Sequence, residues 1–191
     1  ALIGCLRASG VMPGAIEALA LDLQPLALAR VALGADERFS GAPLAELVRR
    51  HSAVQRLERM PIAMACVAAG KRDGQVVAFA PVRIRGQSYV DADWHQPLPV
   101  RLARALGARF VIAVDATAHI DRAPPGAERY RASDLKKKAL VDADAAAADL
   151  VLKPDFGYWV SLSRDFRERA IAAGYREAMA KERELRAVHR A

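Results

Sequence analysis

The stretch YVDADWHQPLPVRLARALGARFVIAVD, residues 89–115, decides the predicted fold. Its first apolar segment ends at Asp91, and a loop then leads to a short helix over residues 99–106, which Gly107 closes. Residues 110–115 follow as a continuous apolar run that ends in an acid, a pattern typical of a buried parallel strand. A short helix joined tightly to a strand on either side is characteristic of a βαβ unit, so the stretch predicts an α/β fold.

On the N-terminal side of this stretch, the pattern predicts three helices and two hairpins. The helices are expected over residues 1–9, 13–23 and 44–51. A continuous apolar run at residues 61–67 predicts a buried strand, with residues 75–79 as its hairpin partner. Residues 82–84 and 87–90 flank Arg85-Gly86 and predict the second hairpin.

On the C-terminal side, residues 116–132 lack periodicity and predict a surface loop. A helix is expected over residues 133–148, capped by Ser133 or Asp134, followed by a strand at residues 150–152. Residues 164–190 predict one or two amphipathic helices, broken near Gly174. The pattern shows neither an internal repeat nor a linker, so one domain is expected over residues 1–191.

The composition narrows the possible functions. The formal net charge is +7, but the basic residues are spread along expected helices among acidic ones, which favours solvated helical faces over a nucleic-acid surface. No apolar run approaches the roughly 20 residues that a membrane span needs. Cys5 and Cys66 lie far apart in apolar stretches, so they are expected to be buried small hydrophobes rather than disulfide or metal ligands. The predicted location is the cytoplasm.

Asp91 is the candidate catalytic residue. Ligands of open α/β sheets bind at the carboxyl ends of the strands, and a carboxylate there can orient a nucleophile or accept its proton. The alternative is that Asp91 only caps a turn or helix.

The residues around Asp91 resemble the patatin-like phospholipase family. Residues 79–91 (FAPVRIRGQSYVD) and 97–115 (PLPVRLARALGARFVIAVD) carry the resemblance. Residues 1–10 are similar to the helix that follows the family's Gly-x-Ser-x-Gly elbow, and residues 149–155 and 172–175 are similar to its late strand and last helix. The resemblance implies a three-layer α/β/α patatin-like fold with a central, mostly parallel sheet flanked by helices.

The resemblance also implies a lipid acyl-ester hydrolase with a Ser-Asp dyad, in which Asp91 is the base. No serine of the sequence lies in a Gly-x-Ser-x-Gly elbow, so the nucleophile and a glycine-rich oxyanion loop are expected upstream of Ala1. A further segment is expected between Phe79 and Ala80. The implied substrate is a phospholipid or another lipid ester. No cofactor, metal or nucleic acid is expected, and peripheral contact with a membrane is left open.

Three departures from the family pattern support an alternative function. Ala92 and Asp93 stand at small, glycine-type positions, and Gln96 replaces an asparagine. Asp93 either raises the pKa of Asp91 by repulsion or faces water. These changes favour, as the alternative, a catalytically inactive patatin-like domain that binds lipid or a protein partner.

Several other residues allow more than one interpretation or are considered as ligands. His95 is a substrate contact or a surface histidine, and His119 with Asp121 lacks a third ligand at metal spacing. Residues 136–138 (Lys-Lys-Lys) face lipid headgroups or water. Phe156, Tyr158 and Trp159 form an interfacial patch, a core or a partner interface.

Overall fold

A computed structural model describes residues 2–24, 42–54, 56–72 and 82–188. The chain divides into two compact units, Ala1–Ala92 and Asp93–Ala191, and each is considered by itself. The expectation of a single domain stays a prediction. Within the described ranges, no helix combines the length and the apolar character that crossing a membrane requires.

The first unit opens with a small group of helices. These are α1 (Leu2–Ala8), α2 (Pro13–Asp22), α4 (Ala42–His51) and the short 3₁₀ helix η1 (Leu57–Arg59). Helix α1 packs on α2 and α4, and its Leu6 is only 1% exposed. The chain leaves α1 at Gly10, whose φ of 102° favours glycine. The helices predicted in this part of the chain are therefore confirmed, with small shifts of their ends.

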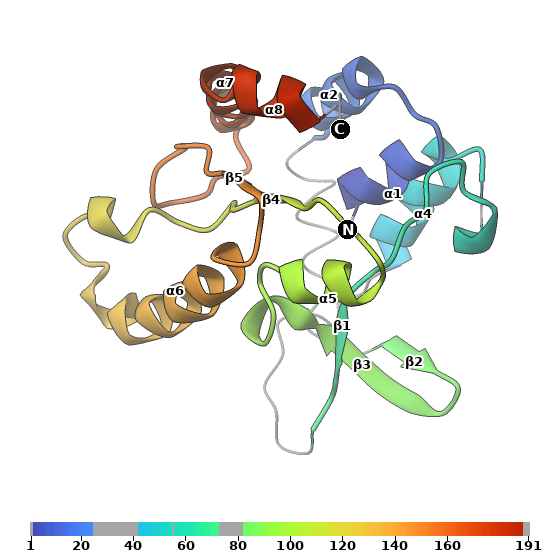
Figure 1. Ribbon diagram of the computed structural model, residues 1–191, viewed down its shortest axis with the longest axis horizontal. Helices are drawn as coiled ribbons and strands as arrows, with labels where there is room; N and C mark the ends of the chain where they lie inside the picture. The colour runs from blue at the N-terminus through green and yellow to red at the C-terminus, as the bar shows by residue number, and fades with distance from the viewer. Residues whose placement is uncertain (1, 25–41, 55, 73–81, 189–191) are drawn as a thin grey trace. The chain divides into compact units, whose positions relative to one another are not determined.

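A three-stranded antiparallel sheet completes the first unit (Figure 1). Its central strand is β3 (Gln87–Asp91), with β1 (Ala68–Gly70) on one edge and β2 (Val82–Ile84) on the other. Tyr89 faces Val82 across one pair and Gly70 across the other. Arg85 and Gly86 join β2 to β3 with φ angles of 50° and 82°, as a two-residue hairpin turn requires. The hairpin predicted here is confirmed.

The strand predicted at residues 61–67 is wrong, because strand β1 begins only at Ala68. The reason lies in its partner: Asp91 is the last residue of β3 and pairs with Ala68, so earlier residues find no backbone groups to bond on β3. Ile62 is accordingly 44% exposed.

The prediction of two buried cysteines is also wrong, since Cys66 is exposed and Cys5 is half-buried. The predicted strand at residues 75–79 lies outside the described residues, as does the position between Phe79 and Ala80.

The second unit is built on a parallel pair of strands. Strand β4 (Ile112–Val114) pairs with β5 (Leu150–Leu152), and helix α6 (Arg131–Ala145) lies between them in sequence. The expectation that residues 89–115 form a βαβ unit is therefore wrong, because β3 and β4 belong to different sheets. Both edges of β3 are already occupied by β1 and β2, so β4 pairs with β5 instead.

Helices lie on both sides of the β4–β5 pair (Figure 1). Helix α5 (Val100–Ala105) and α6 lie on one side and α7 (Arg164–Ala180) on the other. The core forms on the side of α5 and α6, where Val111 and Ala113 pack with Leu98, Val100 and Val141. Ile112 and Val114 point the other way and are 42% and 55% exposed, so the predicted parallel strand is confirmed but is buried on one face rather than two. Mixed α/β architecture is thus present.

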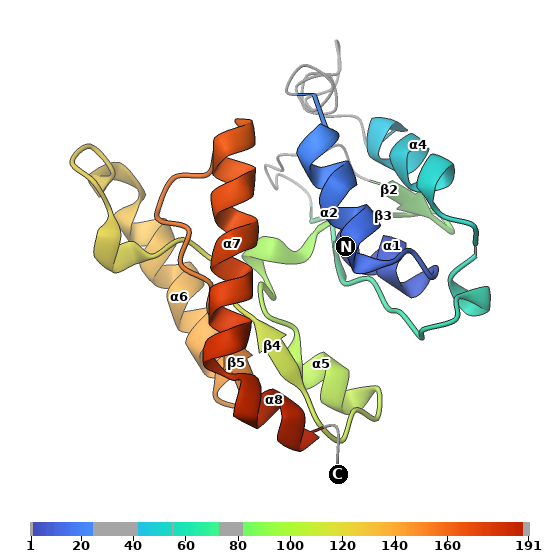
Figure 2. The ribbon, with the colours of Figure 1, turned by 90° about the horizontal axis from the view of Figure 1, so that it is seen from above.

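The remaining helices follow the predicted order with different ends. The loop after β4 contains two 3₁₀ helices, η3 (Ile120–Arg122) and η4 (Glu128–Tyr130), and α6 starts directly after it without a side-chain cap. Helix α7 is capped by Ser163, whose Oγ accepts a hydrogen bond from the Phe166 N–H at 3.2 Å. The break predicted near Gly174 is wrong: α7 continues through it, and the chain bends at Lys181 before α8 (Glu182–Val188), as Figure 2 shows.

Candidate functional site

Asp91 is the last residue of the central strand of the first unit. Val90 beside it is only 6% exposed and holds the strand end in place, whereas Asp91 itself is exposed. Ala92, which is 5% exposed, then begins the short 3₁₀ helix η2 (Ala92–Trp94). The candidate base therefore stands at the carboxyl end of an ordered strand, immediately before the chain turns.

Asp93, the first residue of the second unit, is ion-paired with a lysine of helix α6 in the same unit. The Lys137 ammonium lies 2.5 Å from Asp93 Oδ2, and the Asp93 side chain is 44% exposed. The Asp93 carboxylate is therefore partly exposed to water, and it is also ion-paired. His95 is exposed and Gln96 is half-buried.

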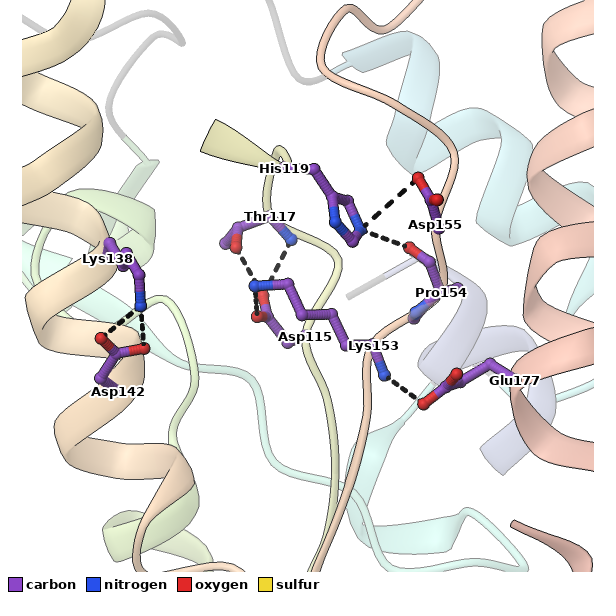
Figure 3. Close-up of polar contacts among 9 residues, drawn as sticks. All are labelled: Asp115, Thr117, His119, Lys138, Asp142, Lys153, Pro154, Asp155 and Glu177. Carbon is purple, nitrogen blue, oxygen red and sulfur yellow. Dashed lines mark hydrogen bonds and ion pairs between the residues drawn. The ribbon is translucent and has the colours of Figure 1, made fainter. Parts of the chain in front are cut away.

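A polar network occupies the carboxyl ends of β4 and β5 (Figure 3). Asp115 follows β4 directly, and its Oδ1 accepts hydrogen bonds from the Thr117 N–H at 3.0 Å and the Thr117 hydroxyl at 2.6 Å. Lys153 follows β5, and its ammonium lies 2.9 Å from Asp115 Oδ2. The Asp115 side chain is only 4% exposed, whereas that of Lys153 is 40% exposed. The network ties the two strand ends together.

The network also controls the ionisation of Asp115. Burial acts to raise the pKa of this carboxyl group, but the Thr117 hydrogen bonds and the Lys153 ammonium outweigh it and hold the pKa below its usual value. Asp115 is therefore an anion at neutral pH, with its charge neutralised locally. These contacts give Asp115 a structural role at the ends of β4 and β5.

Next to this network, His119 fastens the loop that follows β4 (Figure 3). Its Nε2 lies 3.2 Å from the Pro154 carbonyl oxygen and 3.9 Å from Asp155 Oδ1. The Glu177 carboxylate of α7 accepts a hydrogen bond from the Lys153 N–H at 3.0 Å. The described residues contain no cluster of three or more histidine, cysteine, aspartate or glutamate side chains arranged for a metal ion.

A pocket of about 430 Å³ lies between the loop after β4 and helix α6. Its lining combines apolar side chains with three lysines: Ile120, Leu135, Val141, Lys137, Lys138 and Lys153. Each of these ammonium groups contacts a carboxylate, namely Asp93, Asp142 and Asp115. Asp121 and Asp134 also line the pocket, so its wall carries charges of both signs beside apolar side chains, which suits a mixed polar and apolar ligand better than a bare anion.

The sequence singled out Asp91 as a candidate, which stays a prediction, and did not point to the network of Asp115, Thr117 and Lys153. A signal for the network was present, because Asp115 and Lys153 each come directly after a short apolar strand. The carboxyl ends of parallel strands share one edge of a sheet, so two such residues of opposite charge are expected to meet. What the sequence did not supply was the pairing of β4 with β5.

Known proteins give no further guide to this site: no family model matches the chain, and no curated protein matches it. The resemblance to patatin-like phospholipases therefore rests on sequence motifs alone, chiefly those of residues 79–91 and 97–115.

Proposed function

We propose that the protein is a lipid acyl-ester hydrolase of the patatin-like type, in which Asp91 is the base of a Ser-Asp dyad. The nucleophilic serine and the oxyanion loop are proposed to lie upstream of Ala1, in a three-layer α/β/α domain with a mostly parallel central sheet. The observation that carries the proposal is the position of Asp91, exposed and last in the central strand β3. The helices on both sides of the β4–β5 pair support the layered fold.

The proposed ester hydrolysis needs a serine hydroxyl, the Asp91 carboxylate and the backbone N–H groups of an oxyanion loop. The serine hydroxyl attacks the ester carbonyl carbon while Asp91 accepts the hydroxyl proton, and the leaving alcohol takes that proton when the C–O bond breaks. Water then attacks the acyl-enzyme while Asp91 accepts its proton, and Asp91 returns that proton to the serine oxygen as the acyl C–O bond breaks and the fatty acid leaves. Backbone N–H groups of the oxyanion loop stabilise the negative charge on the carbonyl oxygen in both steps.

The fold around Asp91 suits a positioning role of this kind. Strand β3 is bonded on both edges, and the buried Val90 and Ala92 flank the carboxylate in sequence. A catalytic group held by a regular element keeps its direction better than one on a free loop. Asp91 is thus anchored through its backbone while its side chain remains accessible.

A second candidate, a non-catalytic patatin-like domain, is favoured by one observation. Ala92 is buried and Asp93 is ion-paired to Lys137, so the two positions that resemble the family's small residues make packing and charge contacts in this chain. Such a domain would bind lipid without cleaving it. Hydrolysis is the criterion that separates the two candidates.

The test uses the full-length protein and a chromogenic fatty-acyl ester. Asp91→Asn keeps the size of the side chain but removes the proton acceptor, so the rate is expected to fall by about 10²–10⁴-fold. Asp93→Asn, a matched change two residues further on, is expected to stay within about threefold of the unchanged protein. Equal rates for the unchanged protein and Asp91→Asn would rule out the dyad, and no hydrolysis by any variant would favour the non-catalytic domain.

A further inference from the structure

Apolar and aromatic side chains are exposed together after strand β5. Trp159 is 52% exposed, Val160 76% and Leu162 49%, and Tyr130 at the end of η4 is 37% exposed. The Tyr130 and Trp159 rings meet edge to face with centroids 5.8 Å apart, so the two segments form one surface. We call Tyr130, Trp159, Val160 and Leu162 the aromatic patch.

Tyr158 connects the aromatic patch to helix α6. Tyr158 packs edge to face on Trp159 at 4.8 Å, and its hydroxyl donates a hydrogen bond to Asp134 Oδ2 of α6 at 2.6 Å. This hydrogen bond raises the pKa of Tyr158 to about 12, so the phenol keeps its proton at neutral pH. Trp159 is therefore presented outward on an ordered support, without the cost of ordering a loose loop.

Basic side chains lie next to the residues of the aromatic patch in sequence. The Arg129 guanidinium lies 4.7 Å from the centre of the Tyr130 ring, and Arg131 and Arg164 are exposed at the ends of the two segments. Because Arg164 is ion-paired with Glu168, Arg129 and Arg131 are the arginines of residues 128–131 and 158–164 that stand against the single acid Glu128. The patch therefore combines a small excess of positive charge beside Tyr130 with exposed tryptophan, tyrosine, valine and leucine.

This combination fits one partner better than the others. Tryptophan and tyrosine favour the interface of a lipid bilayer, aliphatic side chains enter its outer apolar layer, and arginines are attracted to anionic headgroups. A stable protein–protein interface uses about 20–30 residues on each side, far more than the four of the aromatic patch. We propose that the aromatic patch docks the protein on anionic phospholipid membranes; its use in presenting substrate rests on the proposed lipid hydrolase function, whereas docking itself does not.

The first test is sedimentation of the full-length Asp91→Asn protein with vesicles, so that no lipid is consumed. Binding is expected with vesicles of phosphatidylcholine plus phosphatidylserine, and it is expected to weaken as salt is added. The double change Trp159→Ser/Val160→Ser is expected to weaken it by about tenfold or more. The matched control is Tyr175→Ser/Met179→Ser, because these side chains on α7 are 63% and 61% exposed but lie outside the patch. Equal loss in both double variants would overturn the proposal.

A spectroscopic test asks whether the patch itself meets the lipid. Brominated phospholipid is expected to quench part of the tryptophan fluorescence, and Trp159→Phe is expected to remove that quenching while binding persists. Unchanged quenching in Trp159→Phe would contradict docking through the patch. Self-association that disappears in Trp159→Ser/Val160→Ser, without vesicle binding by the unchanged protein, would assign the patch to a second copy of the chain instead.

The outcomes separate docking from catalysis. Hydrolysis of a soluble short-chain ester without vesicle binding would overturn docking and leave the proposed hydrolase standing. Vesicle binding through the patch without hydrolysis of any ester would support docking and overturn the proposed hydrolase.

Discussion

The Asp115 carboxylate is buried, hydrogen-bonded and ion-paired. Because these contacts favour its charged form, titration of this one residue makes the free energy of unfolding depend on pH. Because its pKa in the folded protein lies below the unfolded value of about 3.9, its contribution to stability is complete above that pH. The contribution is lost as the pH falls through the lower, folded pKa. Stability should therefore decline on acidification.

We expect Asp115→Asn to lower the free energy of unfolding by about 2 kcal/mol near neutral pH, because the hydrogen bonds and ion pair lose their charged acceptor. Urea unfolding of the full-length protein from about pH 7 to about pH 3 should also show a weaker acid dependence for this variant. The matched control is Asp142→Asn: its side chain is 58% exposed in its pair with Lys138, so a change within about 0.5 kcal/mol is expected. An acid dependence identical to that of the unchanged protein would show that Asp115 is not the titrating group.

The position of a residue in its strand, helix or turn could be predicted where its neighbours in sequence determine it. Asp91 at a strand end, Gly107 after a helix and Gly86 in a turn are each required by the few residues around them. The pairing of Asp115 with Lys153, and of Asp93 with Lys137, joins residues 38 and 44 positions apart. Such pairs depend on which strands and helices pack together, and a single sequence does not state that.

Among the elements, the β2–β3 hairpin depends on a turn with two positive φ angles. Arg85 adopts φ 50°, which a side chain with a Cβ atom tolerates poorly, whereas Gly86 at 82° is well suited. We expect Arg85→Asn to raise the free energy of unfolding by about 0.5–1 kcal/mol and Gly86→Val to lower it by about 1 kcal/mol or more. Urea unfolding of the full-length variants measures both, and a stabilising Gly86→Val would contradict the turn geometry.

Helix α7 contains a glycine that it does not need. Gly174 lies inside Arg164–Ala180, and an added Cβ atom would find no heavy atom within 4 Å. We expect Gly174→Ala to raise the free energy of unfolding by about 1 kcal/mol, because alanine loses less backbone entropy in a helix. The reciprocal change in the same helix, Ala172→Gly, is expected to lower it by a similar amount. A thermal unfolding midpoint lowered by Gly174→Ala would contradict a continuous helix.

Gly174 also shows why the ends of helices and strands are hard to predict from a sequence pattern. An isolated glycine in a helical pattern marks either the end of the helix or a less stable position inside it, and α7 continues through Gly174. Residues 61–67 failed for a related reason: an apolar run can form a strand only where a partner offers backbone groups, and β3 ends at Asp91.

At the scale of the whole molecule, the alternation of helices and strands was predictable, but the sheet assignments were not. The sequence order of β3, α5 and β4 resembles a βαβ unit, yet β3 is bonded to β1 and β2, and the parallel pair forms through α6. The sequence also predicted that basic residues lie among acidic ones on exposed helical faces. Arg164 and Glu168, which form an ion pair on α7, are an example.

The proposed function depends on the Asp91 carboxylate activating a serine that precedes Ala1, and covalent labelling tests this most directly. The full-length protein is treated with a fluorophosphonate probe and the modified residue is located by peptide mass spectrometry. We expect one labelled serine, in a Gly-x-Ser-x-Gly sequence before Ala1, with labelling slowed about 100-fold or more by Asp91→Asn and kept by Asp93→Asn. A folded protein that stays unlabelled, or that labels equally fast with Asn at position 91, would contradict the account.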